Sequence, residues 1–168
     1  MGVTPERLAE LLEAHAAALE LFASQWSQAP ADVVQEAFVE LARQPQVPQN
    51  PVGWLYRVVR NRAASEARSA RRRKRRESAV ASANEAWFQT PEQGDLGADE
   101  AAEALRGLPE GLREVLVARI WGGLTFEQIG EITDTSASTA FRRYEEALSL
   151  LRSRLRVSCP NHKTFPQI

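Results

Sequence analysis

Hydrophobic residues recur along most of this chain at the spacing of an amphipathic helix, and the alternation of a half-buried strand is absent. Thr4 followed by Pro5 is a cap and first-turn pair, which predicts a first helix. A second helix is expected to begin at Pro30 and a third at Pro51, because the proline-rich segment 44–51 must be a loop. The apolar faces predicted for these helices contain Leu8, Leu11, Leu12, Leu19, Phe22, Trp26, Val33, Val34, Ala37, Phe38, Leu41, Trp54, Leu55, Val58 and Val59.

The pattern changes over residues 79–99, where small, polar and acidic residues predominate. This composition predicts a flexible linker, in which Trp87 and Phe88 are interpreted as a partly buried anchor. Helical spacing then returns, and Pro109 opens a helix that is expected to end at Gly122–Gly123. The core face predicted for this helix contains Leu112, Val115, Leu116, Ala118 and Trp121.

Two helices joined by a tight turn are predicted next. Residues 125–128 form a capping-box sequence that begins a short helix, and Ser136 caps a longer helix that reaches about Val157. Gly130 lets the two helices approach closely, and Asp134 is acceptable at a turn position with positive φ. This outline is typical of a helix-turn-helix, although a helical hairpin in any bundle looks similar. The inward residues are Ile129, Ile132, Ala140, Tyr144, Ala147, Leu148, Leu151 and Leu155.

Charge is strongly segregated along the chain, although the formal net charge is only −1. Residues 57–76 contain ten Arg or Lys and one acid, whereas residues 77–114 contain nine acids and two arginines. A solvated charged face more often mixes the two signs. The concentrated basic segment therefore favours a polyanionic partner such as nucleic acid.

Other classes of protein fit the sequence poorly. No apolar run approaches the roughly 20 residues of a membrane span, and the N-terminus carries charges where a signal peptide is apolar. The one cysteine, Cys159, fits a reducing cytoplasm, and with His162 it supplies too few ligands for a metal site. We therefore expect a cytoplasmic protein without catalytic residues, metal or cofactor, in which His15 is structural.

Two parts of the chain resemble one family. Residues 32–41 (DVVQEAFVEL) and 51–73 (PVGWLYRVVRNRAASEARSARRR) resemble region 2 of the extracytoplasmic-function (ECF) sigma factors of bacterial RNA polymerase, and residues 108–155 resemble their region 4. The resemblance implies an all-α fold with two small helical domains, a region 2 helical bundle and a region 4 helix-turn-helix, joined by an acidic flexible linker. The expected boundaries are 1–78 for the first domain, 79–99 for the linker, 100–157 for the second domain and 158–168 for a tail.

The resemblance also implies roles for individual residues. Those that match the helix docking on core polymerase are Asp32, Gln35, Glu36 and Phe38, and loop 44–51 matches the loop that captures a flipped base. Contacts with the −10 promoter element are implied for Trp54, Arg57, Arg60 and Asn61, with Arg68 on the same helical face. Contacts with the −35 element are implied for Ser138, Thr139, Phe141, Arg142 and Arg143.

Elementary chemistry agrees with these roles. Arg57, Asn61 and Arg68 share a helical face that can follow a phosphate backbone, and the six bases 71–76 would add nonspecific attraction. Several positions depart from the family pattern. Ala29 and Ala31 stand in place of an acidic pair, which predicts weaker or altered docking on polymerase. The positions that predict weaker upstream binding are Thr133, Asp134 and Thr135 in the turn, Ala140 in place of valine, and the acids Glu145 and Glu146.

Three hypotheses for the function follow. The first is a sigma factor that binds core RNA polymerase and promoter DNA, with an anti-sigma protein as a candidate partner that would hold the two domains together. The second is a stand-alone helix-turn-helix regulator, which has no reason to contain segment 32–61. The third, an enzyme acting on nucleic acid, lacks a recognisable catalytic or metal-binding constellation. We expect the free protein to bind duplex promoters weakly, because its acidic helices and linker oppose the basic helix until polymerase separates the domains.

Overall fold

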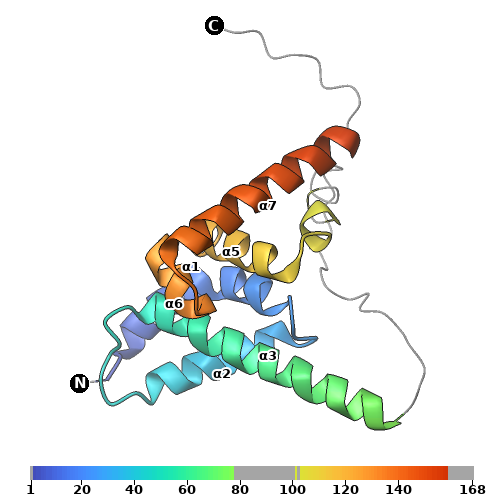
Figure 1. Cartoon of the computed structure of the whole chain (residues 1–168). Coiled ribbons are helices and arrows are strands. Elements are labelled where there is room, and N and C mark those ends of the chain that lie inside the picture. Colours follow the sequence, from blue (N-terminus) through green and yellow to red (C-terminus); the bar gives the residue numbers. More distant parts are fainter. Residues whose placement is uncertain (1, 78–100, 102, 159–168) are drawn as a thin grey trace, which may run out of the picture.

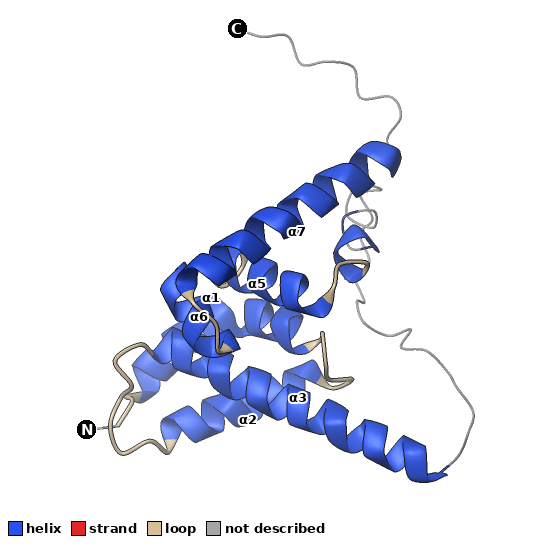
Figure 2. Cartoon of the chain, viewed as in Figure 1, coloured by secondary structure: helices blue, strands red, loops and turns tan. Residues whose placement is uncertain are grey.

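The computed structural model describes residues 2–77, 101 and 103–158, and this part consists of helices, turns and loops without a strand (Figure 2). The helices are α1 (Pro5–Ala23), α2 (Pro30–Ala42), α3 (Pro51–Glu77), α5 (Glu110–Ile120), α6 (Phe126–Thr133) and α7 (Ala137–Ser158), with a short helical turn at 103–106 before α5. The all-α prediction is therefore confirmed. The predicted linker with Trp87 and Phe88, and the tail with Cys159 and His162, lie outside the described residues.

The three helices α1, α2 and α3 pack on one another and form what we call the N-terminal module, residues 2–77 (Figure 1). The predicted caps are present: the Thr4 side chain accepts from the Arg7 amide, and Asn50 accepts from the Gly53 amide at the start of α3. Leu12 was predicted to be buried, but it is 46% exposed. The fully buried core of this module includes Leu19, Phe22, Ala37, Leu41, Leu55, Tyr56 and Val59.

The C-terminal module, residues 103–158, has the predicted helix-turn-helix outline. Thr125 and Gln128 form the capping box of α6, and Asp134 has the left-handed φ of 54° in the turn before α7. A Cβ atom on Gly130 would lie 2.7 Å from the Thr135 carbonyl oxygen, so this close approach requires glycine. One prediction is wrong: Trp121 is the C-cap of α5 and is 48% exposed.

The two modules are packed against each other in this structure, with α5 against α1 and α6 against α3 (Figure 1). Their buried apolar residues form one cluster that extends through both modules. The two predicted helical domains are both present, and in this conformation they lie in contact. Helical periodicity identifies the buried side of each helix, but it does not distinguish a module's own core from a surface that covers its neighbour.

Candidate nucleic-acid interface

The basic helix α3 presents only part of its predicted DNA-binding face to solvent. Arg57, Asn61 and Arg68 are exposed, and so are the bases 71–75. Trp54 and Arg60 are half-buried. The inner side of the same helix carries Leu55, Val59 and Ala63 into the core of the N-terminal module, which holds α3 in place.

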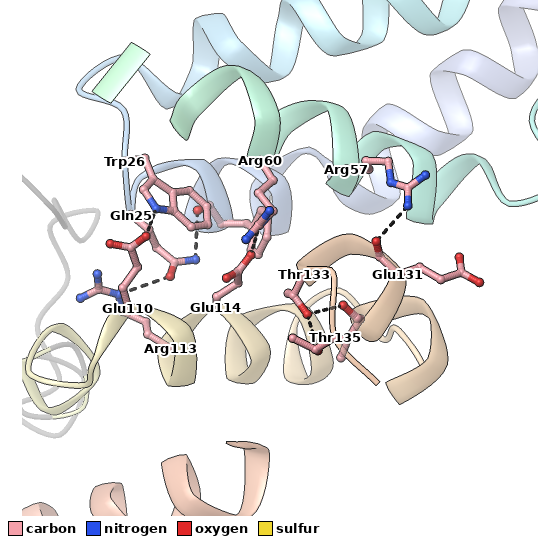
Figure 3. Close-up of polar contacts among 12 residues, drawn as sticks. Gln25, Trp26, Arg57, Arg60, Glu110, Arg113, Glu114, Glu131, Thr133 and Thr135 are labelled. Atoms are coloured by element: carbon pink, nitrogen blue, oxygen red, sulfur yellow. Dashed lines mark hydrogen bonds and ion pairs between the residues drawn. The ribbon is translucent and has the colours of Figure 1, made fainter. Parts of the chain in front are cut away.

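The two arginines nearest the start of α3 are bound to the C-terminal module. Arg57 donates a hydrogen bond of 2.9 Å to the backbone carbonyl of Glu131, although much of its side chain is exposed. Arg60 forms an ion pair with Glu114 of α5 (Figure 3). The positive groups predicted to hold promoter DNA therefore bind acceptors of this same chain.

Two further contacts join the modules beside α3. The Trp26 indole donates to the Glu110 carboxylate at 2.7 Å, and Arg113 donates to the Gln25 side chain at 3.3 Å (Figure 3). Gln25 is buried and donates in turn to the Phe22 carbonyl at 3.1 Å. The edge of the interface is therefore polar and hydrogen-bonded, which is typical of interfaces between domains that part.

Glu114 is an acid inside this interface and is only 4% exposed. Burial raises the pKa of its carboxyl, while the hydrogen bond and the charge of Arg60 lower it. The Arg143 charge also acts to lower the pKa of Glu114, which brings a predicted −35 residue into the same electrostatic site. The ion pair with Arg60 stabilises the charged carboxylate, whereas burial stabilises the neutral acid. Burial is the stronger effect, because little solvent reaches the carboxyl.

Tyr56 marks the closest approach between the modules. A Cβ atom on Gly122 would lie 2.7 Å from both the Tyr56 hydroxyl oxygen and its ring carbon, so glycine lets the backbone rest on this ring. The Tyr56 hydroxyl is buried and has no hydrogen-bond partner among the described residues. Burial also raises the pKa of this hydroxyl. The tightest contact of the interface therefore leaves one polar group unsatisfied.

The start of α7 is much more open than the start of α3. Ser136 caps the helix by accepting from the Thr139 amide at 3.1 Å. Ser138, Phe141 and Arg142 are exposed, with Thr139 and Arg143 half-buried. Phe141 rests edge-on against Phe126, with 5.3 Å between ring centroids. This turn of α7 is accessible to a DNA groove in the conformation described.

The residues predicted to dock on polymerase lie on α2, away from the contacts with the C-terminal module. Asp32, Gln35 and Glu36 are exposed, whereas Phe38 is only 3% exposed and belongs to the core. Phe38 also lines a shallow apolar groove between α1 and α2, together with Leu8, Leu12, Val34 and Val39. Arg62 of α3 pairs with Glu36 at 2.7 Å and with Glu40, and these pairs fix the acidic side chains of α2.

Sequence reasoning missed the residues that join the modules. Nothing in the pattern distinguished Gln25, Glu110 or Arg113 from ordinary surface residues. Glu114 did carry a signal, because it immediately precedes four consecutive apolar residues, 115–118, that are all buried. An acid next to such a run requires a cationic partner, which the sequence alone does not identify.

Two other predictions concern metal ions and membranes. Within the described residues, no cluster of three or more potential metal ligands occurs, and no helix is long and apolar enough to cross a membrane. His15 lies half-buried on α1, where burial and the neighbouring Arg7 lower its pKa.

Comparison with known proteins assigns both modules. Residues 7–73 match sigma-70 region 2, and residues 98–151 match sigma-70 region 4. The chain is similar to the sigma factor RpoE from Bartonella quintana, solved in complex with the anti-sigma factor NepR (TM-score 0.73, 23% identity, 92% of this chain and 99% of that chain). It is also similar to CnrH in complex with the cytosolic domain of CnrY (TM-score 0.60, 22% identity, 92% and 90%). No curated protein matches the chain.

At these identities the solved structures support the fold, and the two sigma-70 regions support the family. A basic region 2 followed by a helix-turn-helix region 4 defines a promoter-recognition subunit of bacterial transcription. The chain belongs to the sigma-70 family, and it is an RNA polymerase sigma factor.

Proposed function

We propose that three surfaces of this sigma factor bind three different partners: core polymerase, the −10 element and the −35 element. The exposed side of α2, with Asp32, Gln35 and Glu36, docks on core polymerase. The cationic face of α3, with Arg57, Asn61 and Arg68, holds the −10 element. The first turns of α7 bind the −35 element. The observation that carries this proposal is the presence of an exposed recognition-helix start and a cationic region 2 helix in one chain.

The chemistry of the −10 surface suits single-stranded DNA. Arginines neutralise phosphates, and each phosphate contact steepens the log–log salt dependence by about 0.7 for a single strand. The Asn61 amide has both a donor and an acceptor for a base edge, and Trp54 offers a ring on which a base stacks if the half-buried face is uncovered. Loop 44–51 leads directly into α3 and is proposed as the wall of the flipped-base site.

The −35 surface combines two features of helix-turn-helix proteins. The dipole at the N-terminal end of α7 favours a DNA phosphate there. Arg142 is exposed and can grip a guanine with two hydrogen bonds. Ser138, Thr139, Phe141 and Arg143 flank it and would set the register of the helix on the groove. This role needs no rearrangement of α7 within its module.

The partners follow from the family. We propose core RNA polymerase and promoter DNA as binding partners, and an anti-sigma protein as a third partner, because the similar RpoE structure contains one. The protein acts in the cytoplasm, where polymerase works, and contributes no catalytic group of its own. Its part is to position polymerase and to hold melted DNA.

Transcription initiation reconstituted from purified components tests these three roles. Purified core polymerase and the full chain are expected to produce transcripts from a library of genomic DNA fragments, and neither component alone is expected to do so. The double variant Arg57→Ala/Asn61→Ala should lower promoter opening by roughly tenfold or more, given about 1–3 kcal/mol for a good base contact, while it still co-migrates with core polymerase.

The reciprocal variant provides the control. Gln35→Ala/Glu36→Ala should weaken association with core polymerase but leave the binding of the free protein to DNA unchanged. If the wild-type chain binds duplex DNA but never associates with core polymerase, the stand-alone regulator is the correct interpretation. If the α3 double variant loses polymerase binding and opening together, the −10 assignment is wrong.

A further inference from the structure

The proposed −35 surface contains an exposed aromatic ring. Phe141 lies in the second turn of α7 and is 46% exposed. Ser138 and Arg142, one turn before it and directly after it, are exposed as well. The phenyl ring has neither a donor nor an acceptor for a base edge. Because single exposed apolar residues are common on protein surfaces, the exposure alone identifies no function.

The Phe141 ring is distinguished by its support. Phe126 of α6 contacts it at 5.3 Å between ring centroids, with an angle of 87° between the planes. Phe126 is half-buried: its ring centroid lies 5.5 Å from that of Tyr144 and 4.8 Å from the Arg119 guanidinium carbon. The Phe141 ring therefore rests on a packed aromatic group on one side and is open to solvent on the other. A side chain that is held before binding loses less conformational entropy on contact with a ligand.

The major groove of DNA offers few apolar groups to such a ring. Base edges there present donors and acceptors, and the apolar exception is the C5-methyl group of thymine. Contact with this methyl group removes apolar surface of both partners from water, whereas a phenyl ring over a polar base edge leaves a donor or acceptor without a partner. Arg142, which is proposed to grip a guanine, is the next residue, so the ring is within reach of a neighbouring base pair.

The charge further along the same helix limits contacts with phosphate. Glu145 is exposed one turn after Phe141, and Glu146 is exposed beside it. Acids at these positions repel the DNA backbone. The start of α7, with Ser138, Phe141 and Arg142, therefore has to supply most of the contacts that this helix makes with the groove.

We propose that Phe141 is a specificity-determining residue that recognises a thymine of the −35 element through its C5-methyl group. This role rests on the proposed function, because it assigns a base to the same α7 surface. 5-Methylcytosine carries a methyl group at the same place in the major groove. It should therefore replace thymine at this position better than unmodified cytosine does.

Uracil tests the methyl group alone, because it pairs with adenine and presents the same acceptor as thymine but lacks the C5-methyl. A duplex that the full chain selects from a random library is remade with deoxyuridine in place of one thymine at a time, and binding is measured by fluorescence anisotropy at low salt. For the wild-type chain, we expect one position at which uracil lowers the affinity by about fourfold, as for one buried methyl group. At this position, cytosine should bind more weakly than 5-methylcytosine by a similar factor.

The variant that removes the ring should remove the preference. In Phe141→Ala, duplexes with uracil and with thymine at this position should bind equally. Ile120→Ala is the matched control, because it shortens another apolar side chain of the same module that is 49% exposed, and it should retain the full preference. Neither side chain belongs to the buried core, so both variants are expected to fold.

Three results would refute this role of Phe141. The first is a wild-type chain that selects no A·T pair or binds every uracil-substituted duplex as tightly as the original. The second is a loss with uracil that persists in Phe141→Ala, which would assign the methyl contact to another residue. The third is a Phe141→Ala variant that binds all duplexes like the wild type but associates less tightly with core polymerase, because the ring would then contact protein.

Failure of the proposed function gives a different result. If recognition of thymine is refuted but Arg142→Ala still weakens binding to the selected duplex, α7 remains the −35 surface. If neither Arg142→Ala nor Phe141→Ala changes binding to duplex DNA, the assignment of α7 to the −35 element is wrong, and the role of Phe141 fails with it.

Discussion

The two helices proposed to bind DNA, α3 and α7, differ in how accessible they are. The first turns of α7 are open, with Ser138, Phe141 and Arg142 exposed. The corresponding part of α3 is less open, because Arg60 is half-buried and both Arg57 and Arg60 are bound to the neighbouring module. Both helices come from one closed structure, so the difference reflects the arrangement of the modules and not the folding of either helix.

This difference separates two steps of promoter recognition. Under the proposed roles, α7 can meet duplex DNA at the −35 element without rearrangement, whereas Arg57 and Arg60 must release Glu131 and Glu114 to contact the −10 strand. Weak binding of the free protein to duplex promoters stays a prediction, and the contacts of Arg57 with Glu131 and of Arg60 with Glu114 add a second physical reason to expect it.

The largest effect on the difference between α3 and α7 is expected from a variant that unfolds the C-terminal module. Gly130→Val places a side chain where even a Cβ atom would lie 2.7 Å from a backbone oxygen of the turn. We expect the helix-turn-helix to lose about 3 kcal/mol of stability. Thermal unfolding followed by circular dichroism should show the C-terminal module melting before the N-terminal module.

Gly111 offers a matched control for this prediction. It lies in α5, and a Cβ atom at this position would meet no other atom within 4 Å, so Gly111→Ala should stabilise the protein by about 0.5–1 kcal/mol through helix propensity. In Gly130→Val at a temperature where only the C-terminal module has melted, α3 should bind single-stranded DNA more tightly. Unfolding of both modules in a single transition would show that they do not separate.

A smaller effect tests whether the start of α7 is accessible to DNA. Arg142→Ala should cost roughly 1–3 kcal/mol of affinity for duplex DNA that the protein selects from a random library. Because Arg142 is accessible in this structure, the loss should be the same in the wild-type chain and in Glu114→Arg, which replaces the partner of Arg60 with a cation, as measured by fluorescence anisotropy. Arg152→Ala, an exposed arginine ten residues further along α7, should change affinity little. Unequal losses in the two backgrounds would show that α7 is also gated by the packing.

The fold was largely predictable because its determinants are local. The caps at Thr4, Thr125 and Ser136 and the close approach at Gly130 depend on neighbouring residues, and each was identified from the sequence. Trp121 was assigned to the core because it continues an apolar stripe, yet it lies at the C-cap of α5, where the helix ends and the side chain faces solvent.

The interface between the modules depends on pairs of residues far apart in the chain. Trp26 meets Glu110, and Arg60 meets Glu114, across 84 and 54 residues. No local pattern specifies such pairs, since each partner alone resembles a surface residue. The proposed DNA-binding residues came from motif positions, which indicate chemistry but contain no information about whether another part of the chain covers them.

The smallest effect concerns pH and identifies what Glu114 does in the interface between the modules. Burial raises the pKa of this carboxyl above its ordinary value of 4.5, so the closed form binds the proton more tightly than an open form in which Glu114 meets water. Closure should therefore be strongest below pH 4.5 and weaken as pH rises through the raised pKa. A simple surface ion pair would behave in the opposite way, because it is lost when its carboxylate is protonated.

Because a single proton is involved, the equilibrium between the closed and open forms can change by at most about tenfold per pH unit. Between pH 7.5 and pH 5, we expect the radius of gyration of the free protein and its affinity for single-stranded DNA to fall together. Glu114→Gln retains the shape of the side chain but cannot titrate, so both trends should disappear. If the wild-type protein instead opens on acidification, the attraction of Arg60 outweighs burial, and Glu114 holds the modules together mainly by its charge.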